Sequence, residues 1–134
     1  MLVVDDNRDA AESLAMLLRA DGYAVHIAYD GPTALELAEA KRPRAVLLDL
    51  GLPGIDGFQV AERIRAMADG ARTLLIAISG YGQDEHRRRS RQIGFDQHLV
   101  KPVDPVAITE LLESGRQSDA RSGPGNVVAF QKTR

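Results

Sequence analysis

Short apolar runs alternate with segments of helical periodicity along most of the chain. The apolar runs, each expected to form a strand, are 2–4, 24–28, 45–48, 74–78 and 99–100. Between them, apolar residues recur at helical spacing: Ala10, Leu14, Leu17 and Leu18; Ala34, Leu35 and Ala38; Val60, Ile64 and Met67; Ile108, Leu111 and Leu112. A fourth helix with a thinner apolar stripe is expected at 84–93. The alternation predicts an α/β fold, with helices on both faces of a five-stranded parallel sheet.

The character of each apolar run indicates its place in the sheet. Runs 45–48 and 74–78 are continuously apolar, as central strands buried on both faces must be. Run 24–28 alternates around His26 and the run at 99–100 is short, so both suit outer positions. The sequence therefore predicts the strand order 2-1-3-4-5.

Helix boundaries and a change in composition divide the chain. Asp104-Pro105 and Gly31-Pro32 are typical helix starts, while Gly22, Gly70 and Gly94 follow helical segments where a left-handed cap favours glycine. From residue 115 onward the chain is polar, rich in glycine and serine, and without periodicity. We predict one domain over 1–114 and a disordered tail or linker over 115–134.

Composition narrows the setting in which this domain works. The chain has 134 residues, enough for one core, and a net charge of -2, so bulk attraction to nucleic acid or an anionic membrane is not expected. The absence of cysteine excludes disulfides, thiolate metal sites and thiol nucleophiles. No apolar run approaches the ~20 residues that cross a bilayer, and no signal peptide is recognisable. We expect a cytoplasmic protein without membrane insertion.

Polar side chains follow four of the five predicted strands. Asp5 and Asp6 come after the first, Asp49 ends the third, Ser79 follows the fourth and Lys101 follows the fifth. Parallel strands all end at one edge of a sheet, where open α/β sheets bind ligands near the reversal of strand order. We therefore expect three carboxylates, a hydroxyl and an ammonium group in one pocket.

This set of groups suits phosphoryl transfer. Carboxylates held close together raise one another's pKa unless a cation neutralises them, and a hard divalent ion such as Mg²⁺ or Mn²⁺ prefers oxygen ligands. One carboxylate can then attack phosphorus and form an aspartyl phosphate. The metal and Lys101 would supply positive charge, and Ser79 can donate a hydrogen bond to a phosphoryl oxygen.

Four segments of the chain resemble the receiver domain of response regulators. They are Leu2-Val-Val-Asp-Asp-Asn7, Val46-Leu-Leu-Asp49-Leu-Gly-Leu-Pro53-Gly-Ile-Asp-Gly57, Ile76-Ala-Ile-Ser79-Gly80 and Leu99-Val-Lys101-Pro102, in the family's order and spacing. The resemblance covers residues 1 to about 113 and implies a flavodoxin-like fold. It also implies a role in two-component signalling or a phosphorelay, in which Asp49 is the phosphoacceptor.

The resemblance also implies roles for the surrounding residues. Asp6 matches the direct metal ligand, Asp5 acts mainly through water, and the backbone carbonyl of Gly51 matches the third protein ligand beside Asp49. Lys101 matches the phosphate-contacting lysine. The other implied roles are a cis bond before Pro102, a switch formed by Ser79 and His98, and tuning of phosphoryl lifetime by Gly51 and Tyr81.

The function implied by the resemblance is that of a phosphorelay receiver. It would take a phosphoryl group from the phosphohistidine of a histidine kinase or histidine phosphotransfer protein and lose it by self-catalysed hydrolysis, without being a turnover enzyme. Phosphorylation would reshape the face made by the fourth helix, fifth strand and fifth helix, through which the domain could dimerise. The segments 79–84 and 98–104 most resemble receivers attached to hybrid sensor kinases, which also fits a strand that starts at residue 2.

Two other functions and several structural roles remain open from the sequence. A Mg²⁺-dependent phosphatase with an aspartyl-phosphate intermediate commonly has a second acid two residues after the nucleophile, where this chain has Gly51. A phosphorylation-independent interaction module would not need the acids and Lys101.

Several candidate residues could also have a purely structural role. Asp6 could cap the first helix, Ser79 could sit in a plain turn, and His98 could be an ordinary edge-strand residue. His26 and His86 lack a second metal ligand, and the basic run of Arg87, Arg88, Arg89 and Arg91 is a solvated or partner-binding face, with no sign of nucleic-acid binding.

Overall fold

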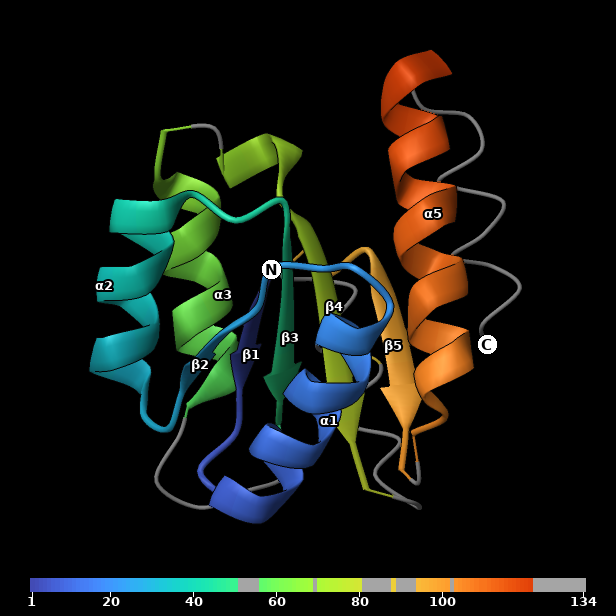
Figure 1. Ribbon diagram of the computed structural model, residues 1–134. Coiled ribbons are helices and arrows are strands. Elements are labelled where there is room, and N and C mark those ends of the chain that lie inside the picture. Colours follow the sequence, from blue (N-terminus) through green and yellow to red (C-terminus); the bar gives the residue numbers. More distant parts are fainter. Residues whose placement is uncertain (51–55, 69, 81–87, 89–93, 102, 122–134) are drawn as a thin grey trace.

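The computed structural model describes residues 1–50, 56–68, 70–80, 88, 94–101 and 103–121 (Figure 1). Its strands are β1 (Leu2–Val4), β2 (His26–Ala28), β3 (Ala45–Asp49), β4 (Leu74–Ser79) and β5 (Gln97–Val100). Its helices are α1 (Arg8–Ala20), α2 (Gly31–Lys41), α3 (Gly57–Ala66), the short 3₁₀ helix η1 (Gly70–Arg72) and α5 (Pro105–Arg121). All the strands pair in parallel in the order β2-β1-β3-β4-β5, so the predicted topology is confirmed.

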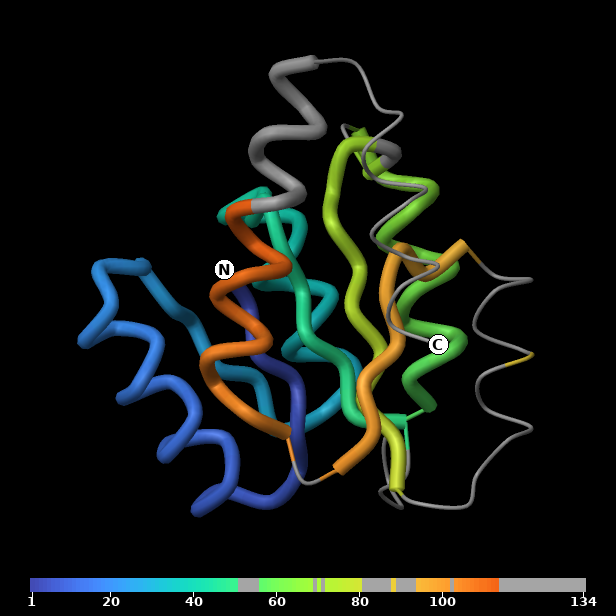
Figure 2. Tube along the Cα trace, turned by 90° about the vertical axis from the view of Figure 1, so that its right-hand side faces the viewer, coloured from blue at the N-terminus to red at the C-terminus, as the bar shows by residue number. Residues whose placement is uncertain are grey.

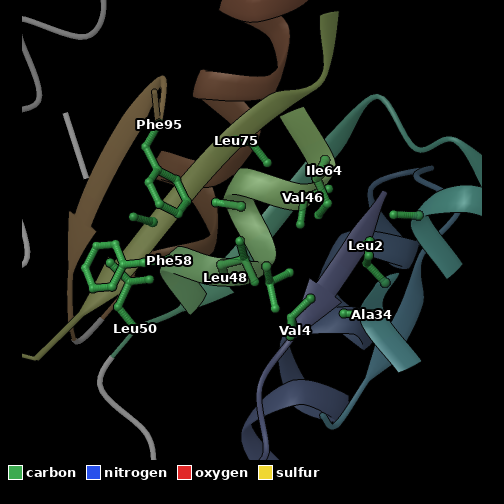
Figure 3. Packing of buried hydrophobic residues seen from close by; sticks show 14 of the residues in the cluster. Leu2, Val4, Ala34, Val46, Leu48, Leu50, Phe58, Ile64, Leu75 and Phe95 are labelled. Carbon is green, nitrogen blue, oxygen red and sulfur yellow. The ribbon is translucent and has the colours of Figure 1, made fainter. Parts of the chain in front are cut away.

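Two apolar layers cover the two faces of the sheet. On one face α1 and α5 bury Ala11, Leu18, Ile108 and Leu112 against β1, β3 and β4. On the other, α2 and α3 pack against the same strands, as the view from the side also shows (Figure 2). Figure 3 shows this second layer from close by, with the rings of Phe58 and Phe95 in an edge-to-face contact at 6.4 Å between centroids. The central strands β3 and β4 are buried almost throughout, as their unbroken apolar runs predicted.

The helix starts follow the capping residues in the sequence. Asn7 caps α1 by accepting the Ala10 N–H at 3.1 Å, and Asp30 caps α2 by accepting the Thr33 N–H at 2.7 Å. Asp6 is therefore not the cap of α1, and that structural explanation for its carboxylate is removed.

The predicted left-handed glycines are confirmed at two positions and wrong at the third. Gly22 and Gly94 have φ of 98° and 106°, but Gly70 has no positive φ and begins η1. A Cβ at Gly70 would lie 2.0 Å from the carbonyl oxygen of Ile64, so close approach of two backbone segments explains this glycine. The left-handed cap that follows α2 is Arg42, with φ 45°.

Helix α5 continues through residues 115–121, which the sequence analysis assigned to the tail. The division between domain and tail stays a prediction, and residues 122–134 lie outside the described residues. So does almost all of the fourth helix expected at 84–93. Within the described part of the chain, no helix is long and apolar enough to cross a membrane.

Candidate functional site

The register of β1 and β3 brings two buried carboxylates to the edge where the strands end, here called the carboxyl edge. Val4 lies beside Leu48, so Asp5 and Asp49 are the next residues of two neighbouring strands. The Asp5 N–H donates to the Ala28 carbonyl at 3.1 Å, and the Leu50 N–H donates to the Ile78 carbonyl at 2.7 Å. These bonds continue the strand pairing past the last apolar residues. Asp5 is 9% exposed and Asp49 only 2%.

Lys101 supplies the positive charge that Asp49 needs. The Lys101 N–H donates to the Ser79 carbonyl at 2.9 Å, which continues the β4–β5 pairing by one residue. From there the Lys101 ammonium reaches Asp49 Oδ2 in an ion pair, and the lysine side chain remains 41% exposed. A buried carboxylate is costly without a charged partner, so this contact explains how Asp49 is tolerated at the end of an apolar strand.

Ser79 and His98 form a second buried polar pair beside the carboxylates. Ser79 Oγ lies 2.6 Å from His98 Nε2, within hydrogen-bond distance. Both residues are nearly inaccessible, at 1% and 3% exposure. They come from neighbouring strands on the same side of the sheet, because His98 lies beside Ala77, two residues before Ser79. The sequence indicated a role for each residue but not this contact.

The charge balance at the carboxyl edge disfavours ionised Asp5. Burial raises the pKa of the Asp5 carboxyl, and the negative charges of Asp49 and Asp6 raise it further. The Asn7 N–H, which donates to Asp5 Oδ1 at 2.9 Å, and the Lys101 ammonium act in the opposite direction without cancelling the rise. Among the described residues of this edge, the three carboxyl groups thus outnumber the Lys101 ammonium, and negative charge is in excess.

This donor set fits a hard divalent cation. Mg²⁺ takes one or two carboxylates, keeps several waters and accepts backbone carbonyl oxygens as ligands. Asp49, Asp6 and Asp5 offer such carboxylates with their charge only partly neutralised. Within the described residues, no three acidic, histidine or cysteine side chains are arranged to hold a metal by themselves. The predicted ligand from the Gly51 carbonyl lies outside the described residues, so the ligand set stays a prediction.

The structure leaves several predicted positions undescribed. Tyr81 and Pro102 lie outside the described residues, as does Gly51, so lifetime tuning and the cis bond stay predictions. His86 and most of the basic run also fall there, and Arg88 is exposed.

A cluster that the sequence analysis missed lies at the rim of the carboxyl edge. Arg8, the first residue of α1, places its guanidinium 4.1 Å from the ring centre of Tyr29, which directly follows β2. The Tyr29 hydroxyl donates to Glu12 at 2.9 Å, and this carboxylate raises the tyrosine's pKa. The sequence signal was available, because Tyr29 is the polar residue that follows the remaining strand.

Comparison with known proteins gives a consistent result. The family model of the response regulator receiver domain matches residues 1–113. A 14.6 kDa protein in the sodA1 3′ region of Leptolyngbya boryana is 34% identical over 113 residues, covering 84% of this chain and 86% of that protein. Response regulator MprA of Mycobacterium sp. (strain KMS) is 36% identical over 124 residues, covering 92% of this chain. The chain spans about half, 52%, of MprA's own length.

Solved structures show the same similarity in three dimensions. A CheY-like response regulator receiver domain protein from Methanospirillum hungatei JF-1 aligns with a TM-score of 0.81 and 27% identity, covering 91% of this chain and 96% of that one. The receiver domain of NtrX from Brucella abortus aligns with a TM-score of 0.79 and 27% identity, covering 87% and 98%.

Proposed function

The chain belongs to the family of response regulator receiver domains, and on that premise we propose that Asp49 accepts a phosphoryl group from a partner's phosphohistidine. The family establishes a phosphoacceptor role in two-component signalling. The observation that carries the assignment to Asp49 is its ion pair with Lys101 at the end of a buried strand, where only 2% of the residue is exposed. A carboxylate held this way is costly for stability and suited to chemistry.

The proposed transfer exchanges one phosphorus bond for another. An Asp49 carboxylate oxygen attacks phosphorus, the P–N bond to the donor imidazole breaks, and the electron pair stays on the leaving nitrogen, which takes a proton. Mg²⁺, when bound by Asp6, Asp49, the Gly51 carbonyl and Asp5 through water, supplies positive charge against the phosphoryl oxygens. Hydrolysis of the aspartyl phosphate by water returns the carboxylate and inorganic phosphate.

Lys101 and Ser79 are placed to act on the phosphoryl oxygens. The Lys101 ammonium already contacts Asp49, so a group joined to that carboxylate arrives within its reach. Ser79 ends the strand beside β3 and can donate its hydroxyl proton to a phosphoryl oxygen. Both contacts are stronger with a dianionic acyl phosphate than with a carboxylate, so they favour the phosphorylated state.

The proposal also covers the phosphoryl donor and the face of the domain that changes on phosphorylation. The donor is a histidine kinase or a histidine phosphotransfer protein, and the responding face comprises the fourth helix, β5 and α5. The buried Ser79–His98 pair supports this choice, because it connects the end of β4 to β5 directly below the carboxyl edge. The chemistry stops at the aspartyl phosphate and its hydrolysis, without turnover of a separate substrate.

The decisive experiment is radiolabelling of Asp49→Asn by candidate histidine kinases. We expect wild type to retain an acid-stable, base-labile label only when Mg²⁺ is present, and the variant to retain none. Asp9→Asn, an exposed acid on α1, is the matched control and should label as wild type does. Circular dichroism and thermal unfolding establish that both variants are folded. Stable label on folded Asp49→Asn would overturn the assignment.

A further inference from the structure

The hydrogen bond between Ser79 and His98 can have either residue as its donor. The two heavy atoms lie 2.6 Å apart, so a single hydrogen occupies the line between them. That hydrogen belongs either to the serine hydroxyl or to Nε2 of the ring. Ser79 and His98 are 1% and 3% exposed, so neither side chain can replace this hydrogen bond with one to bulk water.

The two arrangements have opposite consequences for the carboxyl edge. A serine hydroxyl carries one proton. If it donates to an unprotonated Nε2, Ser79 offers only lone pairs elsewhere and would repel a phosphoryl oxygen. If Nε2–H donates to Ser79 Oγ, the hydroxyl proton is left to rotate toward the carboxyl edge. Ser79 can contact a phosphoryl group favourably only in the second arrangement.

We propose that His98 is a positioning residue that keeps its Nε2 proton on Ser79 Oγ, so that the serine hydroxyl proton faces the phosphoryl group on Asp49. This inference rests on the proposed function, because the direction of the hydroxyl matters only if a phosphoryl group arrives there. It assigns His98 a defined protonation at Nε2, which a role in packing alone would not require. A phenylalanine at 98 would fill similar space and leave the hydroxyl without its donor.

The strand geometry supports an effect transmitted through Ser79. Ile78, the residue before Ser79, lies beside Asp49 in the β3–β4 pairing, while His98 lies on β5, on the other side of β4. His98 is therefore one strand further from Asp49 than Ser79 is. An influence of His98 on phosphoryl chemistry then passes through the hydroxyl, which predicts that the influence disappears when the hydroxyl is removed.

The first test reads the proton directly. Nitrogen–proton correlation NMR of the histidine side chains distinguishes a protonated Nε2 from a protonated Nδ1, and the His98 signals are identified by their loss in His98→Gln. We expect Nε2 of His98 to carry a proton in the unphosphorylated protein. A ring protonated only at Nδ1 would overturn the proposal. This measurement needs no phosphodonor, so its outcome is independent of whether Asp49 is labelled.

The second test is a double-mutant cycle on the labelling rate. His98→Phe should label roughly three- to tenfold more slowly than wild type, the range expected for one misdirected hydrogen bond. His98→Gln, whose side-chain amide can donate to Ser79 Oγ, should recover most of the rate. In a Ser79→Ala background, exchange of His98 for phenylalanine should change the rate by less than twofold. An undiminished effect of the phenylalanine in that background would assign His98 a role in packing and overturn the proposal.

Discussion

The charged side chains at the two ends of the strands differ in the hydrogen-bonding and charged partners that surround them. At the edge where the strands begin, the Arg65 guanidinium donates five hydrogen bonds: two to the Gly94 carbonyl, one each to the carbonyls of Gly70 and Thr73, and one to Asp96. Asp96 Oδ2 also accepts the Leu75 N–H at 2.8 Å. Every donor of the guanidinium is used, and the network joins α3, η1, β4 and the segment before β5.

At the carboxyl edge the described residues carry more negative than positive charge. The Lys101 ammonium, whose side chain is 41% exposed, pairs with Asp49 and acts on Asp5, while the charges of Asp49 and Asp6 help to raise the pKa of Asp5. A charge whose hydrogen bonds are complete within the chain stabilises the fold and has no capacity left for a ligand. Carboxylates that outnumber the neighbouring cation cost stability and keep the capacity to bind another cation. The difference favours the carboxyl edge as the site of the proposed chemistry, without reference to any relative.

Removal of the Arg65 guanidinium should have the largest effect, and this effect is on stability. Arg65→Ala leaves four partly buried acceptor groups without their donor, and we expect the free energy of unfolding to fall by about 3 kcal/mol. Arg63→Ala, an exposed arginine on the same helix, should change it by less than about 0.5 kcal/mol. Urea denaturation measures both. Normal labelling of the folded Arg65→Ala protein would complete the contrast, whereas unchanged stability would refute the structural role of the network.

Removal of the ammonium should affect chemistry more than folding. Lys101→Ala takes away the ammonium that pairs with Asp49, and we expect the rate of phosphotransfer to fall on the order of 100-fold, as for loss of one preorganised charge at a reacting oxygen. The conformational response to phosphorylation, followed by NMR shifts on β5 and α5, should also weaken. Lys41→Ala, at the exposed end of α2, is the matched control. Signalling that is unchanged in Lys101→Ala would remove the lysine from the mechanism.

The sequence located the carboxyl edge because that edge depends on strand ends. An acid, a hydroxyl or a lysine directly after an apolar run is conspicuous, and a parallel sheet brings such positions together. The fold and strand order followed from the same runs. The pairing of Ser79 with His98 did not, because it depends on which way two side chains point from neighbouring strands.

The network at the opposite edge was not predictable in the same way. Arg65 binds mainly carbonyl oxygens, which every residue has, and its acidic partner Asp96 lies 31 positions along the chain. Gly70 was misread for a related reason. A glycine required by the Ile64 carbonyl, which would lie 2.0 Å from a Cβ, looks the same in a sequence as one required by a positive φ.

The smallest expected effect concerns the pH dependence of stability at the carboxyl edge. The pKa of Asp5 is raised above its ordinary value of 3.8, chiefly by burial, so the folded protein binds this proton more tightly than the unfolded chain. Ionised Asp5 is then a cost to the fold, absent below the unfolded pKa and growing as the pH rises through the folded one. In metal-free buffer, Asp5→Asn should raise the free energy of unfolding at pH 7. The rise should be smaller than the fall expected for Arg65→Ala. The gain should vanish at pH 3.

Asp30 provides a control of opposite sign for this measurement. Its hydrogen bonds with Thr33 at the start of α2 lower its pKa, so the folded chain binds its proton less tightly, and its contribution is present above pH 3.8 and lost in acid. Asp30→Asn keeps the helix cap but should lose a little stability at pH 7, with the difference again closing toward pH 3. Urea denaturation at a series of pH values compares the two variants. If Asp5→Asn lost stability at neutral pH as Asp30→Asn does, ionised Asp5 would stabilise the fold. The contrast between the two edges would then be refuted.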